Sequence, residues 1–297
     1  MKLITVAVLT LAATAAFADG KATTEFYYEP AGGQQALQLN LDYMMDPMTY
    51  TENGLTGDAK TNSTSLIVNY GYGLSENMVV GGYLSYGSDA ITASAPGGTD
   101  QTQTASGLGD IHLYFKGFSD MIHYGLDLGI NNGNITEDST TNLRNNNSSG
   151  GMSAKANVGF MMAAGMLNYG ADLSYLYKGT VTTATAGGTN DTTTGDGVLN
   201  LSPFVEYNYG SGFAGAVISY SMVQSGNDTT TTSVATNAAY NVAGLKLFGT
   251  YAFSDSMTGL LSVAYYSVPS YQFDANSAHT TVAYGQTDVN LGFRMTF

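Results

Sequence analysis

The 297-residue sequence contains no cysteine and few charged residues. Without cysteine no disulfide can form, so the stability of this chain has to come from other interactions. Charged residues make up 11% of the chain, whereas about 25% is typical of soluble domains. This scarcity, together with 37 glycines and 22 tyrosines, is typical of a large β structure that exposes little surface to bulk water. The hydrophobic share of 43% argues against disorder of the chain as a whole.

Long apolar runs are also missing, except at the start of the chain. The opening "MKLITVAVLTLAATAAFADG" combines Lys2, an apolar run to about Ala15 and a small-x-small cleavage site at positions 16–18. This pattern predicts a secretory signal peptide over residues 1–18, followed by one domain over 19–297. A short buried N-terminal helix is the alternative. Beyond this run no stretch reaches the roughly 18 apolar residues that a spanning helix needs, which excludes a helical membrane protein.

Apolar and polar residues alternate in the remaining sequence. In the final "TDVNLGFRMTF", Val289, Leu291, Phe293 and Met295 share one parity and polar residues occupy the other. Because successive side chains of a strand point to opposite faces, this pattern predicts a two-faced strand. About twelve such segments of about ten residues follow one another, and ten residues is the length of a tilted membrane-spanning strand.

The charged residues of these segments lie on the parity opposite the apolar set. Because a Lys or Arg facing lipid at mid-bilayer costs about 2–4 kcal/mol, this arrangement predicts a lipid-exposed exterior and a wet lumen. The predicted lumen-lining residues are Asp42, Asp110, His112, Lys116, His123, Asp127, Lys155, Asp172, Glu206, Lys246, Asp288 and Arg294.

A soluble sandwich would give the same parity, so the choice between the two depends on loops and tyrosines. Short turns alternate with long tracts such as "SDAITASAPGGTDQTQTAS". Apolar-parity tyrosines form two belts, by the short turns (Tyr72, Tyr124, Tyr169, Tyr207, Tyr251) and by the long tracts (Tyr43, Tyr86, Tyr177, Tyr220, Tyr265). These features predict an all-β, transmembrane antiparallel up-and-down β-barrel of about 12 strands, with short periplasmic turns and long extracellular loops.

Two short stretches resemble known outer-membrane proteins. The terminal strand, with Phe293, Met295 and Phe297, resembles the C-terminal signature of Gram-negative outer-membrane proteins. This resemblance implies recognition by the barrel-assembly machinery and a place in the outer membrane of a Gram-negative bacterium. "SGLGDIHLYFKG" at Ser106–Gly117 resembles the Ser-Gly-Leu-Gly-Asp strand of barrels grouped under the phenol-degradation meta-pathway label. The second resemblance implies a porin-like barrel and no particular substrate.

The predicted pore is narrow. Eight strands leave an interior that side chains fill and sixteen leave an open channel, so about twelve predict a bore in between. Glycines on the lumen parity are expected to widen it (Gly71, Gly125, Gly129, Gly159, Gly170, Gly292). The loops carry many more acidic than basic residues, which favours cations at the outer mouth.

We therefore predict an outer-membrane porin for passive diffusion of small polar solutes or ions, weakly cation-preferring and without cofactor. Its partners are outer-membrane lipid and the solutes. The alternative is a closed structural or adhesive barrel that acts through its Thr/Asn-rich surface loops. That alternative gains weight if the large lumen-parity residues meet at one level (Tyr114, Met161, Leu176, Phe204, Phe248).

Catalysis and metal binding have weaker support in the sequence. The tight turn after Ser119 predicts that His112 faces Asp127 and that Lys116 faces His123, but no nucleophile follows from spacing, so we expect no enzyme. Three histidines without cysteine are too few for a zinc site, and no basic patch indicates nucleic acid. The segment "TTEFYYEP", residues 23–30, is left open as a further strand or a segment folded into the lumen.

Overall fold

The structure is a computed structural model of the chain. It describes residues 24–52, 55–94, 101–119, 121–131, 135–137, 151–185, 190–193, 195, 197–229, 234–275 and 278–297. The predicted signal peptide, residues 1–18, lies outside the described residues. Within the described ranges, no helix is long and apolar enough to cross a membrane.

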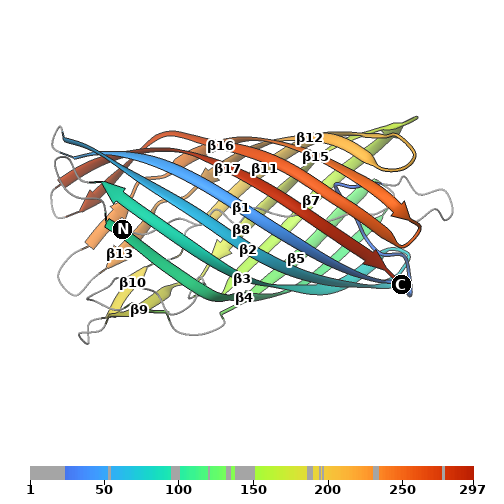
Figure 1. Ribbon diagram of the computed structural model, residues 1–297, viewed down its shortest axis with the longest axis horizontal. Coiled ribbons are helices and arrows are strands. Elements are labelled where there is room, and N and C mark those ends of the chain that lie inside the picture. Colours follow the sequence, from blue (N-terminus) through green and yellow to red (C-terminus); the bar gives the residue numbers. More distant parts are fainter. Residues whose placement is uncertain are drawn as a thin grey trace.

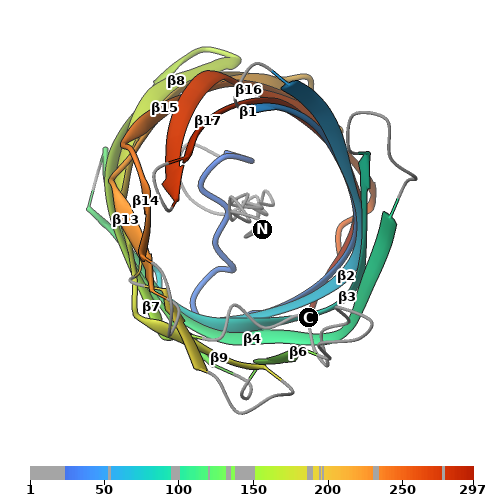
Figure 2. The same cartoon turned by 90° about the vertical axis from the view of Figure 1, so that its left-hand side faces the viewer.

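Twelve long strands form a closed antiparallel barrel (Figures 1 and 2). They are β1 (Gln35–Glu52), β2 (Leu55–Ser75), β3 (Met78–Ser94), β4 (Gln101–Ser119), β5 (Ile122–Ile130), β7 (Ser153–Ala164), β8 (Leu167–Lys178), β11 (Gly197–Asn208), β12 (Phe213–Val223), β15 (Tyr240–Ser254), β16 (Met257–Ala275) and β17 (Ala278–Thr296). Each pairs with its neighbours in chain order, which confirms the predicted up-and-down barrel.

The barrel closes where the first long strand meets the last. β1 pairs with β17 over a ladder from Ala36 opposite Thr296 to Glu52 opposite Thr280. Next to the ladder, Gln35 and Phe297 exchange two backbone hydrogen bonds of 2.8 and 3.0 Å. Closure removes both sheet edges, so every long strand has a partner on each side. Recognition of this final strand by the barrel-assembly machinery remains a prediction.

Within the described parts of the long connections lie five short strands. They are β6 (Ile135–Glu137), β9 (Val181–Thr185), β10 (Asn190–Thr193), β13 (Gly226–Thr229) and β14 (Val234–Asn237). β6 pairs in parallel with β9, and the other pairings are antiparallel.

The long strands extend into tracts that the sequence analysis assigned to loops. β3 continues to Ser94 and β4 begins at Gln101, so much of the tract over 88–106 is strand. Threonine favours strands, and pairing satisfies backbone groups that a loop would leave to water. β2 has 21 residues, whereas about 9–11 span a bilayer. The barrel wall therefore rises well beyond the membrane at the long-loop end.

The outer face of the barrel is apolar. Leu41 and Leu291, which face each other across the β1–β17 pairing, are 50% and 60% exposed. All tyrosines of both predicted belts are exposed as well. An apolar band between two tyrosine girdles is typical of a barrel surrounded by lipid.

The predicted pairing of β4 with β5 needs a correction. Ser119 pairs with Ile122, which leaves positions 120 and 121 for the turn. Lys116 therefore pairs with Gly125, and His123 pairs with Phe118. The predicted register leaves no residue for the loop, although a tight hairpin needs two, so the turn lies one position later than predicted. His112 still reaches Asp127, because diagonal neighbours on one face lie within reach of long side chains.

Candidate functional site: the barrel lumen

The segment before β1 runs inside the barrel. Figure 2 shows this blue segment crossing the interior. Residues Thr24–Pro30, here called the plug segment, form no strand. The hydroxyl oxygen of Thr24 accepts hydrogen bonds from the N–H groups of Phe26 and Tyr27 at 3.1 and 3.3 Å, which closes a turn. Of the two alternatives for this segment, the lumen-folded one is therefore confirmed.

Glu206 on β11 holds the backbone of the plug segment. Its carboxylate accepts hydrogen bonds from the N–H of Glu25 at 3.0 Å and from the N–H of Phe26 at 3.0 Å. Asn168 Nδ2 on β8 donates to the same carboxylate at 2.8 Å. Glu206 is 1% exposed, so these bonds satisfy a carboxylate that water does not reach.

Arg294 on β17 holds the side chains of the plug segment. Its guanidinium donates to the Glu25 carboxylate at 3.3 and 3.4 Å. The same guanidinium lies over the ring of Tyr28, 4.3 Å from the centroid, and donates to Gln38 Oε1 at 3.5 Å. Arg294 and Glu25 are 1% and 3% exposed, so this is a buried ion pair. Breaking such a pair costs about 3–5 kcal/mol, because one charge stays buried without its partner.

Aromatic rings complete the docking of the plug segment. Phe26 stacks on Phe204 with centroids 4.0 Å apart, and Tyr27 stacks on His123 at 3.9 Å. The Tyr27 hydroxyl donates to the carbonyl of Ala171 at 3.2 Å. Desolvation by burial, together with the nearby Asp172 carboxylate, raises the pKa of Tyr27, so the hydroxyl stays protonated and able to donate.

Three of the five large lumen residues that the alternative reading depends on, Met161, Phe204 and Phe248, meet at this level. Met161 and Phe204 join Phe26, Tyr27 and Val217 in one cluster, with Phe248 packed against it. Tyr114 instead donates to Asn69 Oδ1 at 3.0 Å along the wall. The plug segment, rather than wall side chains alone, fills the short-turn end.

The lumen glycines do not widen the bore, contrary to the sequence expectation. Added side-chain atoms at these positions would collide with a neighbour that already fills the space. The neighbours are Tyr114 for Gly71, Asn157 for Gly125, Ser153 for Gly129, Tyr27 for Gly159, Phe204 for Gly170 and Asn40 for Gly292. These glycines make room for inner side chains and, at Gly159, for the plug segment.

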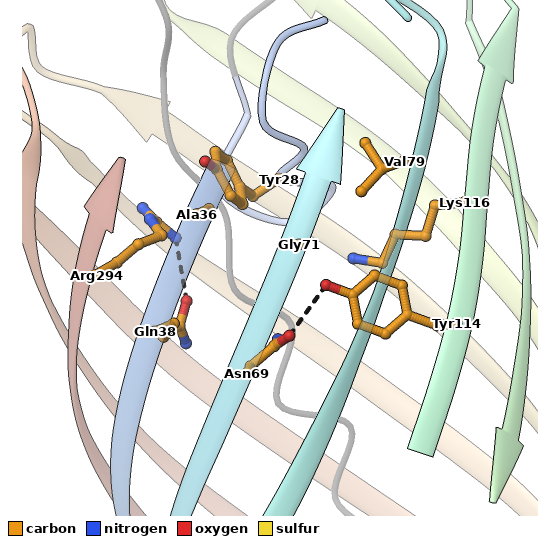
Figure 3. Close-up of a pocket in the computed structure, with 9 residues that line it drawn as sticks. All are labelled: Tyr28, Ala36, Gln38, Asn69, Gly71, Val79, Tyr114, Lys116 and Arg294. Carbon is orange, nitrogen blue, oxygen red and sulfur yellow. Dashed lines mark hydrogen bonds between the residues drawn. The ribbon is translucent and has the colours of Figure 1, made fainter. Parts of the chain in front are cut away.

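A small cavity remains between the plug segment and the wall (Figure 3). Tyr28, Arg294 and Lys116 line it, with polar groups from β1, β2 and β4. Its volume is about 20 Å³, which is room for about one water molecule. Ligand sites typically measure about 300–1,000 Å³, so this hollow is no solute site.

All predicted lumen-lining residues lie on the inner parity and are buried or half-buried. His123, Asp172, Glu206, Asp288 and Arg294 are buried. Asp42, Asp110, His112, Lys116, Asp127, Lys155 and Lys246 are half-buried. Four of the buried ones, His123, Asp172, Glu206 and Arg294, contact the plug segment, a role that could not be predicted from parity.

Other lumen residues form pairs within the wall. His112 Nδ1 lies 2.7 Å from Asp127 Oδ1, and the imidazole stacks on Tyr83 at 4.3 Å. Asn157 Nδ2 donates to Asp172 at 2.8 Å, and Asn290 Nδ2 donates to Asp42 at 3.3 Å. Within the described ranges, no three His, Cys, Asp or Glu side chains are grouped so that they could hold a metal ion.

An apolar cluster lines the lumen at the long-loop end, and the sequence analysis missed it. This tyrosine cluster comprises Val223, Tyr240, Val242, Val268, Tyr271, Val282 and Tyr284, with Met48, Tyr50, Val198 and Tyr266 packed around. Tyr240 stacks on Tyr271 at 4.5 Å, and Tyr271 meets the edge of Tyr284 at 6.5 Å. A register shift between Val268 and Tyr271 turns Tyr271 inward. A set of apolar residues on the inner parity, beyond the tyrosine belt by the long tracts, is the sequence signal that could have revealed this cluster.

Comparison with known proteins supports the fold. An outer-membrane channel from Pseudomonas putida F1 superposes with a TM-score of 0.62 and 11% identity, over 93% of this chain and 100% of that one. A FadL homologue from Pseudomonas aeruginosa gives a TM-score of 0.48 and 9% identity, over 91% of both chains. The toluene transporter TodX of Pseudomonas putida gives 0.43 and 8%, over 91% and 90%. The last two similarities are too low to support an argument.

No protein-family model matches the sequence, and no curated protein matches it. The resemblance of Ser106–Gly117 to the phenol-degradation barrels and that of Phe293, Met295 and Phe297 to the assembly signature therefore remain predictions. What the comparisons establish is the architecture: this chain has the fold of an outer-membrane β-barrel.

Proposed function

We propose that the protein is a channel in the outer membrane of a Gram-negative bacterium, with its short-turn end closed by the plug segment. The observation that supports this most strongly is that a peptide segment bearing Phe26, Tyr27 and Tyr28 fits inside the wall. Wall side chains that filled the bore would leave no room for it. The similarly folded protein from Pseudomonas putida F1 is itself described as an outer-membrane channel.

The lining supports passage of small solutes that carry an apolar group as well as a polar one. The tyrosine cluster occupies one part of the wall at the long-loop end, on β1, β11, β12, β15, β16 and β17. β2, which pairs with β1 beside the cluster, contributes the polar inner residues Thr61, Ser63 and Ser65. An apolar cluster with polar groups beside it suits amphipathic solutes better than the purely polar ones that the sequence suggested.

The plug segment is held by contacts that can be broken without unfolding the barrel. Its docking uses two buried carboxylates, one guanidinium and stacked rings, and no residue of the plug segment belongs to a wall strand. Displacing it would open the short-turn end. The chain thus combines a preformed wall with a removable closure.

Single-channel conductance in planar bilayers tests the proposal. The intact chain is expected to give small or rare current steps, and deletion of residues 24–30 is expected to raise the conductance several-fold. Phe26→Ala with Tyr27→Ala is the matched variant, because it keeps the length of the segment and removes both stacked rings. Bilayers that stay silent with the deleted, demonstrably folded barrel would overturn the channel.

A closed barrel acting at the cell surface is the second candidate. The extension of β2, β3 and β4 beyond the span favours it, because a wall of 21, 17 and 19 residues presents a large protein surface outside the lipid. Silent bilayers would favour this reading. Surface adhesion assays on cells that express the chain would then test it.

A further inference from the structure

Asp46 on β1 is a buried carboxylate with an unused oxygen. The side chain lies on the inner face, beyond Tyr43 of the outer belt, and is 5% exposed. Its Oδ1 is buried and has no hydrogen-bond partner among the residues that the structure describes. Burying a charged group without a partner is costly, and such groups are rare enough in proteins to need an explanation.

The charge next to Asp46 is also negative. Asp288 on β17 is 3% exposed and acts on Asp46 through its charge. Asp288 itself is satisfied, because Gln286 Nε2 donates to both of its oxygens at 2.8 and 3.1 Å. The ammonium of Lys246 acts on Asp42 and Asp288. A positively charged ligand beside Asp46 would therefore stabilise its ionised carboxylate.

The tyrosine cluster lies directly beside this carboxylate. Met48, the next inner residue of β1, pairs with Tyr284 across the β1–β17 ladder. In this register Asp46 and Tyr284 are diagonal neighbours on the inner face, so the carboxylate lies beside this ring. A carboxylate beside aromatic rings binds an ammonium group through two interactions. The carboxylate attracts its charge, and the ring faces add cation–π contacts.

We propose that Asp46, together with Asp288 and the tyrosine cluster, binds an organic ammonium ion with an apolar or aromatic body at the long-loop end of the lumen. This rests on the proposed function in one respect, since such a ligand reaches the site as a solute entering the channel. A bare metal ion fits less well, because no group of three acidic or histidine side chains in the described ranges could hold one. The adjoining apolar side chains favour a ligand with an apolar body.

Titration with 4-fluorophenethylammonium, followed by 19F NMR, tests the proposal on the full chain refolded in nonionic detergent. Asp46→Asn keeps the size and removes the charge, so the dissociation constant is expected to rise at least about tenfold. Asp288→Asn is the second variant and should weaken binding in the same direction. Asp110→Asn is the matched control, because Asp110 is an inner-face aspartate of β4 outside the tyrosine cluster. Its dissociation constant should stay unchanged.

Two further probes separate charge from apolar contact. 4-Fluorophenethyl alcohol has the ring without the charge, and ethylammonium has the charge without the ring, so both should bind much more weakly. Absence of binding to the intact chain would overturn the proposal, as would equal binding by Asp46→Asn or equal competition by ethylammonium or potassium. Heat-dependent gel migration verifies that each variant is folded. Because binding in detergent does not require conduction, the two failures can be told apart. A failed titration would overturn the ammonium site, whereas silent bilayers would overturn the channel.

Discussion

Arg294 and Glu25 bury opposite charges at the short-turn end, and this makes the plug segment sensitive to single substitutions. Glu25→Gln leaves the guanidinium buried without its carboxylate, at a cost of about 3–5 kcal/mol. We expect most of this cost to lower the stability of the docked state relative to the undocked state. A reagent that reaches the plug segment only when it is undocked should then react about a hundredfold faster.

The absence of native cysteine makes that rate measurable. Pro30→Cys places one thiol on the plug segment at a buried residue that takes part in none of the docking contacts described above. Its labelling by a maleimide is compared with and without Glu25→Gln. Asp255→Asn, in the exposed turn between β15 and β16, is the control and should leave the rate unchanged. Equal rates for Glu25→Gln and the parent would show that the ion pair does not hold the segment.

Individual residues show where reasoning from sequence succeeds. Parity alone was sufficient to place Glu206 and Arg294 on the inner face, because the period of a strand is two. It did not reveal their contacts with Glu25, since those join parts of the chain that are far apart in sequence. Gly159 was misread for the same reason: its neighbour Tyr27 comes from outside the wall.

At the scale of one strand, the outer face of β17 lies in the apolar band along one part of its length and beyond the outer tyrosines along another. Leu291 lies in the apolar band, and Thr281 lies beyond the outer tyrosines on the same face. Leu291→Arg should lower the free energy of unfolding in lipid vesicles by about 2–4 kcal/mol. Thr281→Arg should change it by no more than about 0.5 kcal/mol.

Guanidinium titration of both variants in vesicles of the same lipid measures this difference. Because the two arginines share a strand and a face, strand propensity contributes little to the comparison. Equal losses would mean that the apolar band does not end where the tyrosines predict.

Strand order and most turn positions could be predicted, but the register of the β4–β5 turn and the strand ends could not. The turns at 76–77, 165–166 and 255–256 lie where Ser, Asn, Gly and Asp interrupt the alternation. Beyond the outer tyrosines the alternation is lost among threonines, although β3 continues to Ser94. Pairing with neighbouring strands, rather than contact with lipid, stabilises these extensions, so no hydrophobic pattern in the sequence marks them.

For the whole molecule, the formal charge of −14 predicts how a conducting form selects ions. Described carboxylates at the long-loop end include Asp46, Asp58 and Asp89, and several further loop acids lie outside the described residues. An excess of negative charge at a mouth concentrates cations there.

The chain without residues 24–30, in a potassium chloride gradient, should show a reversal potential on the cation side. The potential should shrink as salt rises from 0.1 to 1 M, because the screening length falls from about 10 to about 3 Å. A potential on the anion side would contradict the prediction. A salt-independent potential would place the selective charges deep in the bore instead of at the mouth.

The pairing of β1 with β17 has a consequence for the order of events during assembly. Arg294 lies on the last strand of the barrel in chain order, and Glu25 precedes the first by a few residues. The binding place of the plug segment, shared by β5, β8, β11 and β17, does not exist until these distant strands have come together. Docking is therefore a late step that depends on completed closure. A protease-resistant N-terminal segment would mark finished barrels and distinguish them from intermediates that are inserted but still open along the seam.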